Sequence, residues 1–351
     1  MRTCLHAGGL AAVAPLLLAT SLALADAAGP PRPTLLVPAA LQPCDEPGSD
    51  ANAWIDKVQR GVYGGVCGTA LWFDGLFGDV RYDRDSSETF GRIGLFENYD
   101  RRDRFDNRFL LRARYALPNM QNRLRLTLAR GDEQRLVEER PTNGQKPLPP
   151  GFQFVDDDAW LLGLGYSKNN RLEDGFDFGI GVRLSTPVDP YVKGSYRHNL
   201  IFSDNAMLRF RQTPFWRDSR GFGSTTQLTL DYLATEKVLL RWGNSGTVAE
   251  DDDTEGLEWS TTISAFQSLK QRRAISYTAL LYGETKADVR IQNYGLETTY
   301  RQPTFRKWLF LELSASVTWP RETLEEERRI NPGVGIGLEM YFGPVADVDL
   351  R

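Results

Sequence analysis

The chain has 351 residues, of which 25% are charged and 41% hydrophobic, and its formal net charge is -4 at pH 7. So mild a charge gives no case for a nucleic-acid partner, which a strongly basic chain would attract. No segment supplies the ~20 consecutive apolar residues that a transmembrane helix needs. The mean hydropathy of -0.40 still allows membrane-crossing strands, because their alternating residues average to a polar value.

Residues 1–25 are predicted to form a secretory signal peptide. Arg2 supplies a short basic region, and the apolar stretch Leu10–Leu24 follows it. Small residues at alternate positions provide two cleavage motifs, which end at Ala25 and Ala27. Cleavage at either motif removes Cys4 and His6 and sends the mature chain to the periplasmic side of a bacterial inner membrane.

Residues 26–87 are predicted to form a periplasmic or plug-like segment that contains a short helix. The stretch Gly29–Pro47 is rich in Pro and Ala and is interpreted as a flexible lead. Apolar residues then recur with helical spacing at Trp54, Ile55, Val58 and Val62. Three placements stay open for this segment: inside a barrel, across its periplasmic mouth, or on the membrane surface.

Cys44 and Cys67 are the only cysteines left after cleavage. In an oxidising compartment such a pair is more typical of a disulfide than of a metal site or a nucleophile. We therefore expect a disulfide between them.

From about residue 88 to Phe342, apolar residues occupy every second position. Val334, Ile336 and Leu338, for example, alternate with glycines and with Glu339. A period of two is typical of strands with two different environments, and about 9–11 residues suffice for a tilted strand to cross a membrane. We expect about 14 strands, with 12 or 16 as alternatives, at residues 88–98, 106–117, 122–131, 158–167, 175–185, 191–202, 205–215, 223–234, 237–243, 256–268, 273–284, 287–300, 306–319 and 331–342.

Connection lengths support an even number of antiparallel strands. If the first strand runs outward, every second connection should be a short periplasmic turn. The three longest connections, 131–157, 244–255 and 320–330, all fall in the other set. This sorting predicts an up-and-down arrangement with polar loops on the outer side.

Aromatic residues are predicted to mark the two membrane interfaces, where barrels carry aromatic belts. Those expected at the outer ends of strands are Trp160, Trp216, Trp242, Trp259 and Trp319. Those expected at the periplasmic ends are Tyr115, Tyr166, Tyr232 and Phe342.

These features resemble those of bacterial outer-membrane β-barrel proteins. The ending Gly337-x-x-Met340-x-Phe342 is similar to the signal that the barrel-assembly machinery reads, although residues 343–351 follow it as a tail. The resemblance implies an all-β, transmembrane, antiparallel up-and-down barrel over residues 88–342 in the outer membrane. It also implies lipid and lipopolysaccharide as surroundings and the assembly machinery as a partner during biogenesis.

The function must be inferred from the residues that are predicted to face inward, and the charges of these residues are unevenly distributed. A basic wall is predicted from Arg92, Arg108, Arg112, Arg114, Arg123, Arg125, Arg209 and Arg211. An acidic wall is predicted from Asp231, Glu258, Glu284, Glu312 and Glu339. Closure of the barrel should bring Glu339 close to Arg92.

Two interpretations of this lumen stay open. Opposed walls in an open barrel favour passage of small hydrophilic solutes. In a plugged barrel the same charges neutralise each other, which fits a structural or interaction protein. We favour a channel or transporter for a small polar solute.

Catalysis has weaker support. His198 is the only histidine beyond the signal peptide, and the His-x-Ser-Asn-type signature of outer-membrane lipid hydrolases is absent. A membrane-embedded hydrolase is kept as the third hypothesis. One histidine and a cysteine pair expected to be oxidised give no case for a metal site, and no motif calls for a cofactor.

Overall fold

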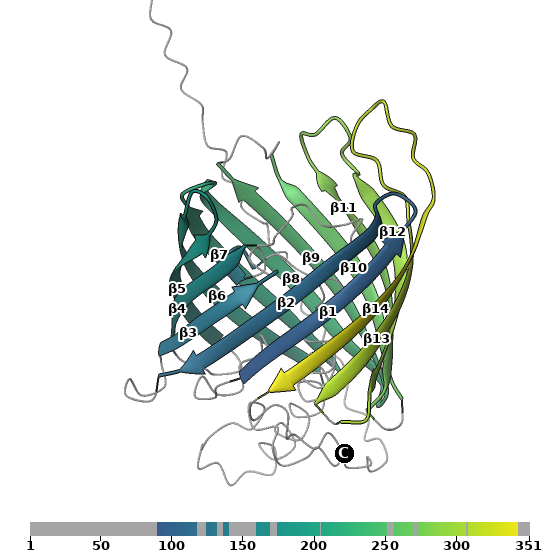
Figure 1. Ribbon diagram of the computed structural model, residues 1–351, viewed down its shortest axis with the longest axis horizontal. Helices are drawn as coiled ribbons and strands as arrows, with labels where there is room; N and C mark the ends of the chain where they lie inside the picture. The colour runs from purple at the N-terminus through teal and green to yellow at the C-terminus, as the bar shows by residue number, and fades with distance from the viewer. Residues whose placement is uncertain are drawn as a thin grey trace, which may run out of the picture. The chain divides into compact units, whose positions relative to one another are not determined.

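The segments with a period of two form strands because each offers one apolar face and one polar face to different surroundings. In the computed structural model, fourteen strands close into one antiparallel barrel (Figure 1). The strands are β1 (Phe90–Asp100), β2 (Arg104–Ala116), β3 (Leu124–Arg130), β4 (Trp160–Lys168), β5 (Asp174–Leu184), β6 (Asp189–Ser203), β7 (Ala206–Arg217), β8 (Gly221–Thr235), β9 (Val238–Ala249), β10 (Glu258–Ser268), β11 (Ala274–Glu284), β12 (Asn293–Pro303), β13 (Leu309–Thr318) and β14 (Asn331–Phe342).

The structure describes residues 90–117, 124–131, 136–139, 159–168, 174–203, 205–250, 256–269, 272–306 and 308–342. The predicted signal peptide, the segment 26–87 with Cys44 and Cys67, Arg123 and the tail 343–351 lie outside these residues. None of the described residues belongs to a helix long and apolar enough to cross a membrane.

Each strand pairs with its neighbours in sequence, and β1 pairs with β14 to close the barrel. The closing register places Gly91 opposite Phe342 and Asp100 opposite Gly333. The number of strands agrees with the fourteen predicted, and the segments predicted at residues 191–202 and 205–215 form β6 and β7. The predicted architecture is confirmed.

Two strand boundaries differ from the prediction by six residues, and the others by at most three. The ninth strand is predicted to end at Gly243, but β9 continues to Ala249. The twelfth is predicted to begin at residue 287, but β12 begins at Asn293. In β9 the apolar alternation stops because the outward positions Asn244 and Gly246 carry no apolar side chain, although the ladder with β8 and β10 continues there.

Burial separates the two faces of every strand. Large apolar side chains on the outer face are exposed, among them Ile263 (62%), Leu296 (60%) and Val334 (60%). The alternate residues point inward and are mostly polar, as in the buried set Arg112, Arg301 and Glu339. An apolar outside and a polar inside are the arrangement of a transmembrane barrel.

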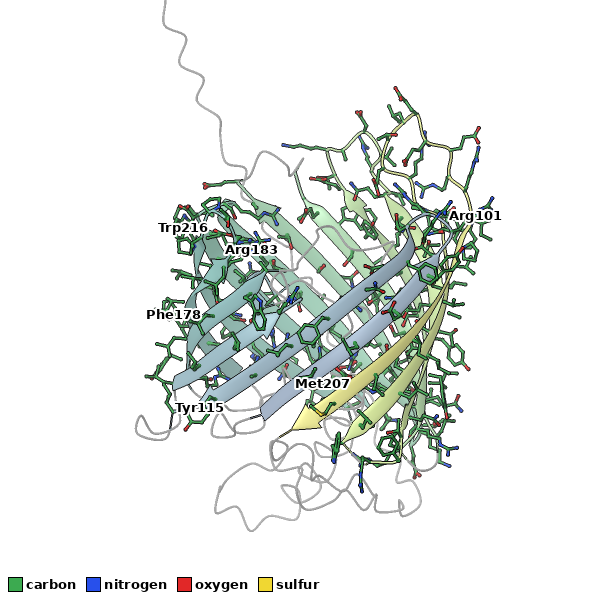
Figure 2. The ribbon with its side chains drawn as sticks, viewed as in Figure 1. Arg101, Tyr115, Phe178, Arg183, Met207 and Trp216 are labelled. Atoms are coloured by element: carbon green, nitrogen blue, oxygen red, sulfur yellow. The ribbon has the colours of Figure 1, made fainter. Side chains whose placement is uncertain are left out.

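The rim where β1 begins and β14 ends is called the lower rim, and the opposite rim the upper rim (Figure 1). The β3–β4, β9–β10 and β13–β14 connections all join strands at the upper rim, so the predicted sorting of long loops is confirmed. Figure 2 places Trp216 toward the upper rim, Tyr115 toward the lower rim and Phe178 on the outer surface between them.

Candidate functional site

A short piece of the β3–β4 connection, residues 136–139, lies inside the barrel. Leu136 and Val137 are buried in an apolar cluster with the inward residues Ala129, Leu161 and Tyr191. Because these three side chains come from β3, β4 and β6, the cluster fixes the segment to one side of the lumen. The two residues that follow, Glu138 and Glu139, are buried carboxylates.

Glu139 binds four side chains on β6 and β7. Its Oε1 lies 2.8 Å from Nζ of Lys193. Its Oε2 accepts hydrogen bonds from Arg211 Nη1 (2.8 Å), Ser195 Oγ (2.8 Å) and Thr213 Oγ1 (3.0 Å). Lys193 also donates to the backbone oxygen of Leu136, so the same cation holds both ends of the segment.

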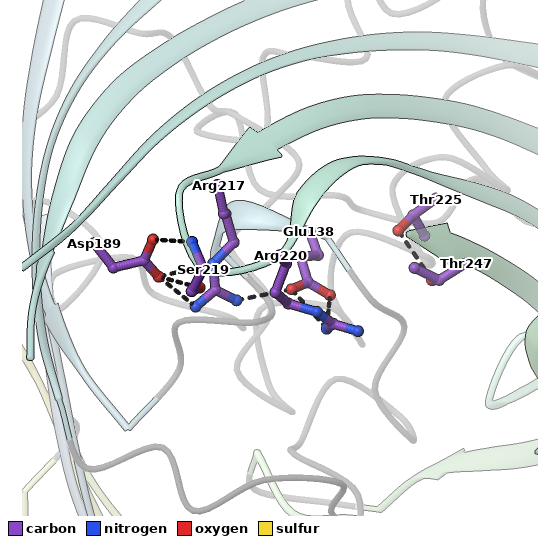
Figure 3. Close-up of polar contacts among 7 residues, drawn as sticks. All are labelled: Glu138, Asp189, Arg217, Ser219, Arg220, Thr225 and Thr247. Atoms are coloured by element: carbon purple, nitrogen blue, oxygen red, sulfur yellow. Dashed lines mark hydrogen bonds and ion pairs between the residues drawn. The ribbon is translucent and has the colours of Figure 1, made fainter. Parts of the chain in front are cut away.

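Glu138 binds a second pair of cations (Figure 3). One of them, Arg217, is the last residue of β7 and therefore lies at the upper rim. Its Oε1 lies 2.8 Å from Arg217 Nη1 and 3.0 Å from Arg220 Nη1. Asp189 holds the other side of Arg217, with Oδ2 2.9 Å from Nη2, and Ser219 donates to the same carboxylate at 2.7 Å. Shared donors and acceptors of this kind stabilise charges away from bulk water.

A recess that is partly open to solvent adjoins the segment. The cations that line it are Arg114, Arg125, Lys193 and Arg211, and the carboxylates are Glu139 and Asp177. Arg125 pairs with Asp177 at 2.9 Å. The lining also includes three glycines, whose lack of side chains leaves the recess room: Gly163, Gly165 and Gly179.

The predicted basic and acidic walls meet at two places. At the barrel closure, Glu339 pairs with Arg92 at 3.0 Å and also binds Arg301. Arg301 is almost fully buried and reaches Glu312 as well. On the other side of the lumen, Asp231 lies 2.6 Å from both Arg209 Nη2 and Arg241 Nε.

The remaining predicted wall residues that the structure describes also lie on the inward face. Arg92 lies opposite Arg112, and Arg114 opposite Phe90, in the β1–β2 ladder. The guanidinium of Arg108 lies over the ring of Phe96, 5.2 Å from its centre. Glu258 and Glu284 are directly opposite each other in the β10–β11 ladder.

Sequence reasoning missed the two acidic residues that reach this site from a loop. The sequence Leu136-Val137-Glu138-Glu139 lies within a long polar connection, where an apolar pair next to an acidic pair is out of place. That contrast was the available signal for a segment that folds back into a basic lumen. Asp189, Arg217 and Arg220 were missed because their importance depends on this segment.

The aromatic residues fall mostly where the belts were predicted. Trp160, Trp216 and Trp259 lie in the upper ends of β4, β7 and β10, and Trp319 follows the upper end of β13. Tyr115, Tyr166 and Tyr232 lie toward the lower ends of β2, β4 and β8, and Phe342 is the last residue of β14. Trp242 differs, because the longer β9 places it in the middle of the strand, opposite Ile263.

The side chain of His198 does not face the lumen. It alternates with the exposed outward residues Tyr196 and Leu200, and its ladder neighbours are Asp174 on β5 and Phe210 on β7. Among the described residues, no group of three or more His, Cys, Asp or Glu side chains is arranged to hold a metal ion. These placements give the hydrolase hypothesis no supporting geometry.

No protein-family model matches the chain, and no curated protein matches it. Several solved porin structures are similar in architecture. The KdgM porin is 6% identical with a TM-score of 0.35, covering 72% of this chain and 99% of that chain. OmpT of Vibrio cholerae is 9% identical with a TM-score of 0.43, covering 74% and 99%. An anion-selective porin from Comamonas acidovorans is 13% identical with a TM-score of 0.42, covering 72% and 98%.

At these identities and TM-scores the similarity concerns the barrel alone and says nothing about a solute. The architecture is established by the structure of the chain itself, in which the strands form a closed ladder with an apolar outer face and a polar inner face. The chain is an outer-membrane-type β-barrel.

Proposed function

We propose that the protein is an outer-membrane channel for small hydrophilic solutes. The observation that carries this proposal is the solvent-open recess lined by charged side chains inside a barrel with an apolar exterior. Fourteen strands enclose more space than the smallest barrels, which side chains fill. A polar lining is what a hydrated solute needs to replace its water contacts.

An uneven distribution of charge is part of this proposal. Cations predominate on the inner face of β2–β7, and carboxylates on the inner face of β8–β14. The first group contains Arg108, Arg112, Arg114, Arg125, Arg183, Lys193, Arg197, Arg209, Arg211 and Arg217. The second contains Asp231, Glu258, Glu284, Glu297, Glu312 and Glu339. Opposed charges of this kind orient polar solutes across the lumen.

Recording from the refolded full-length protein in planar lipid bilayers tests the proposal. We expect discrete current steps in salt solution, and swelling of liposomes in small neutral sugars. A folded barrel that conducts no ions and admits no sugar would exclude a channel. Folding is verified separately by the mobility shift between unheated and heated samples on gels.

A non-conducting structural barrel is the alternative, and the Arg301 network favours it. Arg301, Glu312 and Glu339 are all buried, so charges near the barrel closure are already neutralised by each other. Such a lumen needs no solute to satisfy its polar groups. Capture of a protein partner by crosslinking, together with absent conductance, would support this alternative.

A further inference from the structure

The donors that bind Glu139 form a compact carboxylate site on the barrel wall. Lys193 and Ser195 are two residues apart on β6, and Arg211 and Thr213 are two residues apart on β7. Alternation places all four side chains on the inward face, and the hydroxyl oxygens of Thr213 and Ser195 lie 3.1 Å apart. Because paired strands hold these side chains, the donors are positioned by the barrel itself.

The charge at this site is suited to an anion. Two cations and two hydroxyl groups converge on one carboxylate, whose two oxygens offer about four acceptor positions. Ser195, Thr213 and Glu139 are buried, with exposed fractions of 2%, 0% and 7%. Hydrogen bonds to an ionised group are stronger than neutral ones, and more so away from bulk water.

The backbone of Glu139 indicates that the site holds the segment in place. Its φ is 53°, in the left-handed region that residues other than glycine enter at a cost of about 1 kcal/mol or more. The contacts of the carboxylate offset this cost. Glu139 thus occupies the donor site in a backbone conformation that its own preferences do not favour.

The neighbouring recess gives dissolved anions access to the same donors. Lys193 and Arg211 line it together with Arg114 and Arg125, against the carboxylates of Glu139 and Asp177. Four cations and two carboxylates thus line one recess. An anion that enters this recess reaches the donors that bind Glu139 and competes with its carboxylate.

We infer that Lys193, Ser195, Arg211 and Thr213 form a binding site for solutes that carry a carboxylate, and that Glu139 fills this site when no solute is bound. The inference rests on the proposed channel function and narrows its solute class to small organic anions. A bound solute takes the place of the Glu139 carboxylate without any covalent step.

The test compares D-glucuronate with D-glucose, which differ by the carboxylate. Binding to the detergent-solubilised full chain is measured by titration calorimetry, and block of current is measured in bilayers. In Glu139→Gln the competing charge is gone, so we expect glucuronate to bind at least about tenfold more tightly than in wild type, because one charged competitor for two cations has been removed. Glucose should bind no better.

Matched variants separate this site from a general change in charge. Glu138→Gln removes the same charge one residue away but leaves the four donors intact, so it should not strengthen glucuronate binding by a comparable factor. Adding Arg211→Gln to Glu139→Gln should abolish the gain, and Arg211→Lys should restore part of it. Thermal unfolding of each variant verifies that the barrel is folded.

Equal affinity for glucuronate and glucose in Glu139→Gln would overturn the inference, as would an equal gain in Glu138→Gln. If the protein conducts ions but does not prefer glucuronate to glucose, the proposed channel function is retained and only the carboxylate site is excluded. Absent conductance removes the channel, while calorimetry still decides whether the site binds a carboxylate.

Discussion

Arg92 on β1 and Glu339 on β14 form an ion pair across the closure of the barrel, with Nε 3.0 Å from Oε1. Both side chains are buried, at 4% and 2% exposure. Glu339 also binds Arg301 on β12 and accepts a hydrogen bond from Tyr341 Oη at 3.1 Å. The first and last strands are thus joined by a buried charge network as well as by their backbone ladder.

Replacing Glu339 by Gln should destabilise the barrel. The change keeps the shape but leaves Arg92 and Arg301 with less negative charge. We expect a loss of about 2–3 kcal/mol, below the 3–5 kcal/mol for breaking a buried ion pair completely, because Glu312 still faces Arg301. Urea unfolding in lipid vesicles measures the loss. Glu327→Gln is the control, since its pair with Arg329 at 2.9 Å is 76% and 78% exposed and should contribute less than ~1 kcal/mol. Equal losses in the two variants would contradict a special role for the closure.

The closure was predictable from sequence, whereas the inner site was not. The period of two determines which face of each strand points inward, so the alternation alone assigns Arg92 and Glu339 to the lumen, and an up-and-down barrel makes their strands adjacent. The path of residues 136–139 has no periodicity, and its inward position follows from contacts with Lys193 and Arg211 that are distant in sequence. The end of β9 was mispredicted for a related reason, because Asn244 and Gly246 are outward residues without apolar side chains.

Charge on the outer face should be far more costly than charge in the lumen. Ile263 is 62% exposed in the middle of β10, and its neighbour Thr262 points inward. Ile263→Arg should destabilise the barrel in lipid by about 2–4 kcal/mol, the cost of Arg near the middle of a bilayer. Thr262→Arg should cost less because Thr262 faces the polar inner side of the barrel. Vesicle unfolding compares the two, and a larger loss for Thr262→Arg would reverse the assigned faces.

Three polar residues on the outer face of β7 and β8 satisfy one another. Gln212 donates to Ser224 at 2.6 Å and accepts from Thr226 at 2.7 Å. Gln212→Leu alone should destabilise the barrel by about 1 kcal/mol, because both hydroxyls lose their partner in a medium without water.

Replacing the whole group should remove that penalty. In the triple variant Gln212→Leu, Ser224→Ala and Thr226→Val, no polar group of the three is left without a partner, so stability should return close to that of wild type. Unfolding in vesicles of the single and triple variants provides the comparison. A triple variant less stable than Gln212→Leu would mean that these hydroxyls act through other contacts.

The β13–β14 connection should respond to acid through Glu326. The backbone amide of Glu322 donates to Glu326 at 2.9 Å, and Arg102 lies 3.4 Å away. Chiefly the amide, and then the charge of Arg102, lower the pKa of Glu326 below its ordinary value of 4.5. A lowered pKa means that these contacts contribute fully above the unfolded-state pKa and are lost as the pH falls through the folded-state pKa.

The amide resonance of Glu322 should therefore titrate at a pH below 4.5. Arg102→Gln removes one of the causes of the lowered pKa and should move that midpoint upward. Glu326→Gln should abolish the titration. A midpoint that is unchanged in Arg102→Gln would show that the guanidinium does not act on this carboxyl.

A substitution at Val137 tests whether residues 136–139 limit the passage of ions or support the barrel. It is 2% exposed and packs with Leu161 and Tyr191, so a carboxylate in its place would be buried without a partner. Val137→Asp should release residues 136–139 from the wall and raise single-channel conductance. The unfolding temperature should change little, because the strand ladders remain intact.

Val188→Asp, at an exposed position before β6, is the matched control and should alter neither the conductance nor the unfolding temperature. If Val137→Asp lowers the unfolding temperature without raising the conductance, the segment supports the barrel and does not limit the passage of ions.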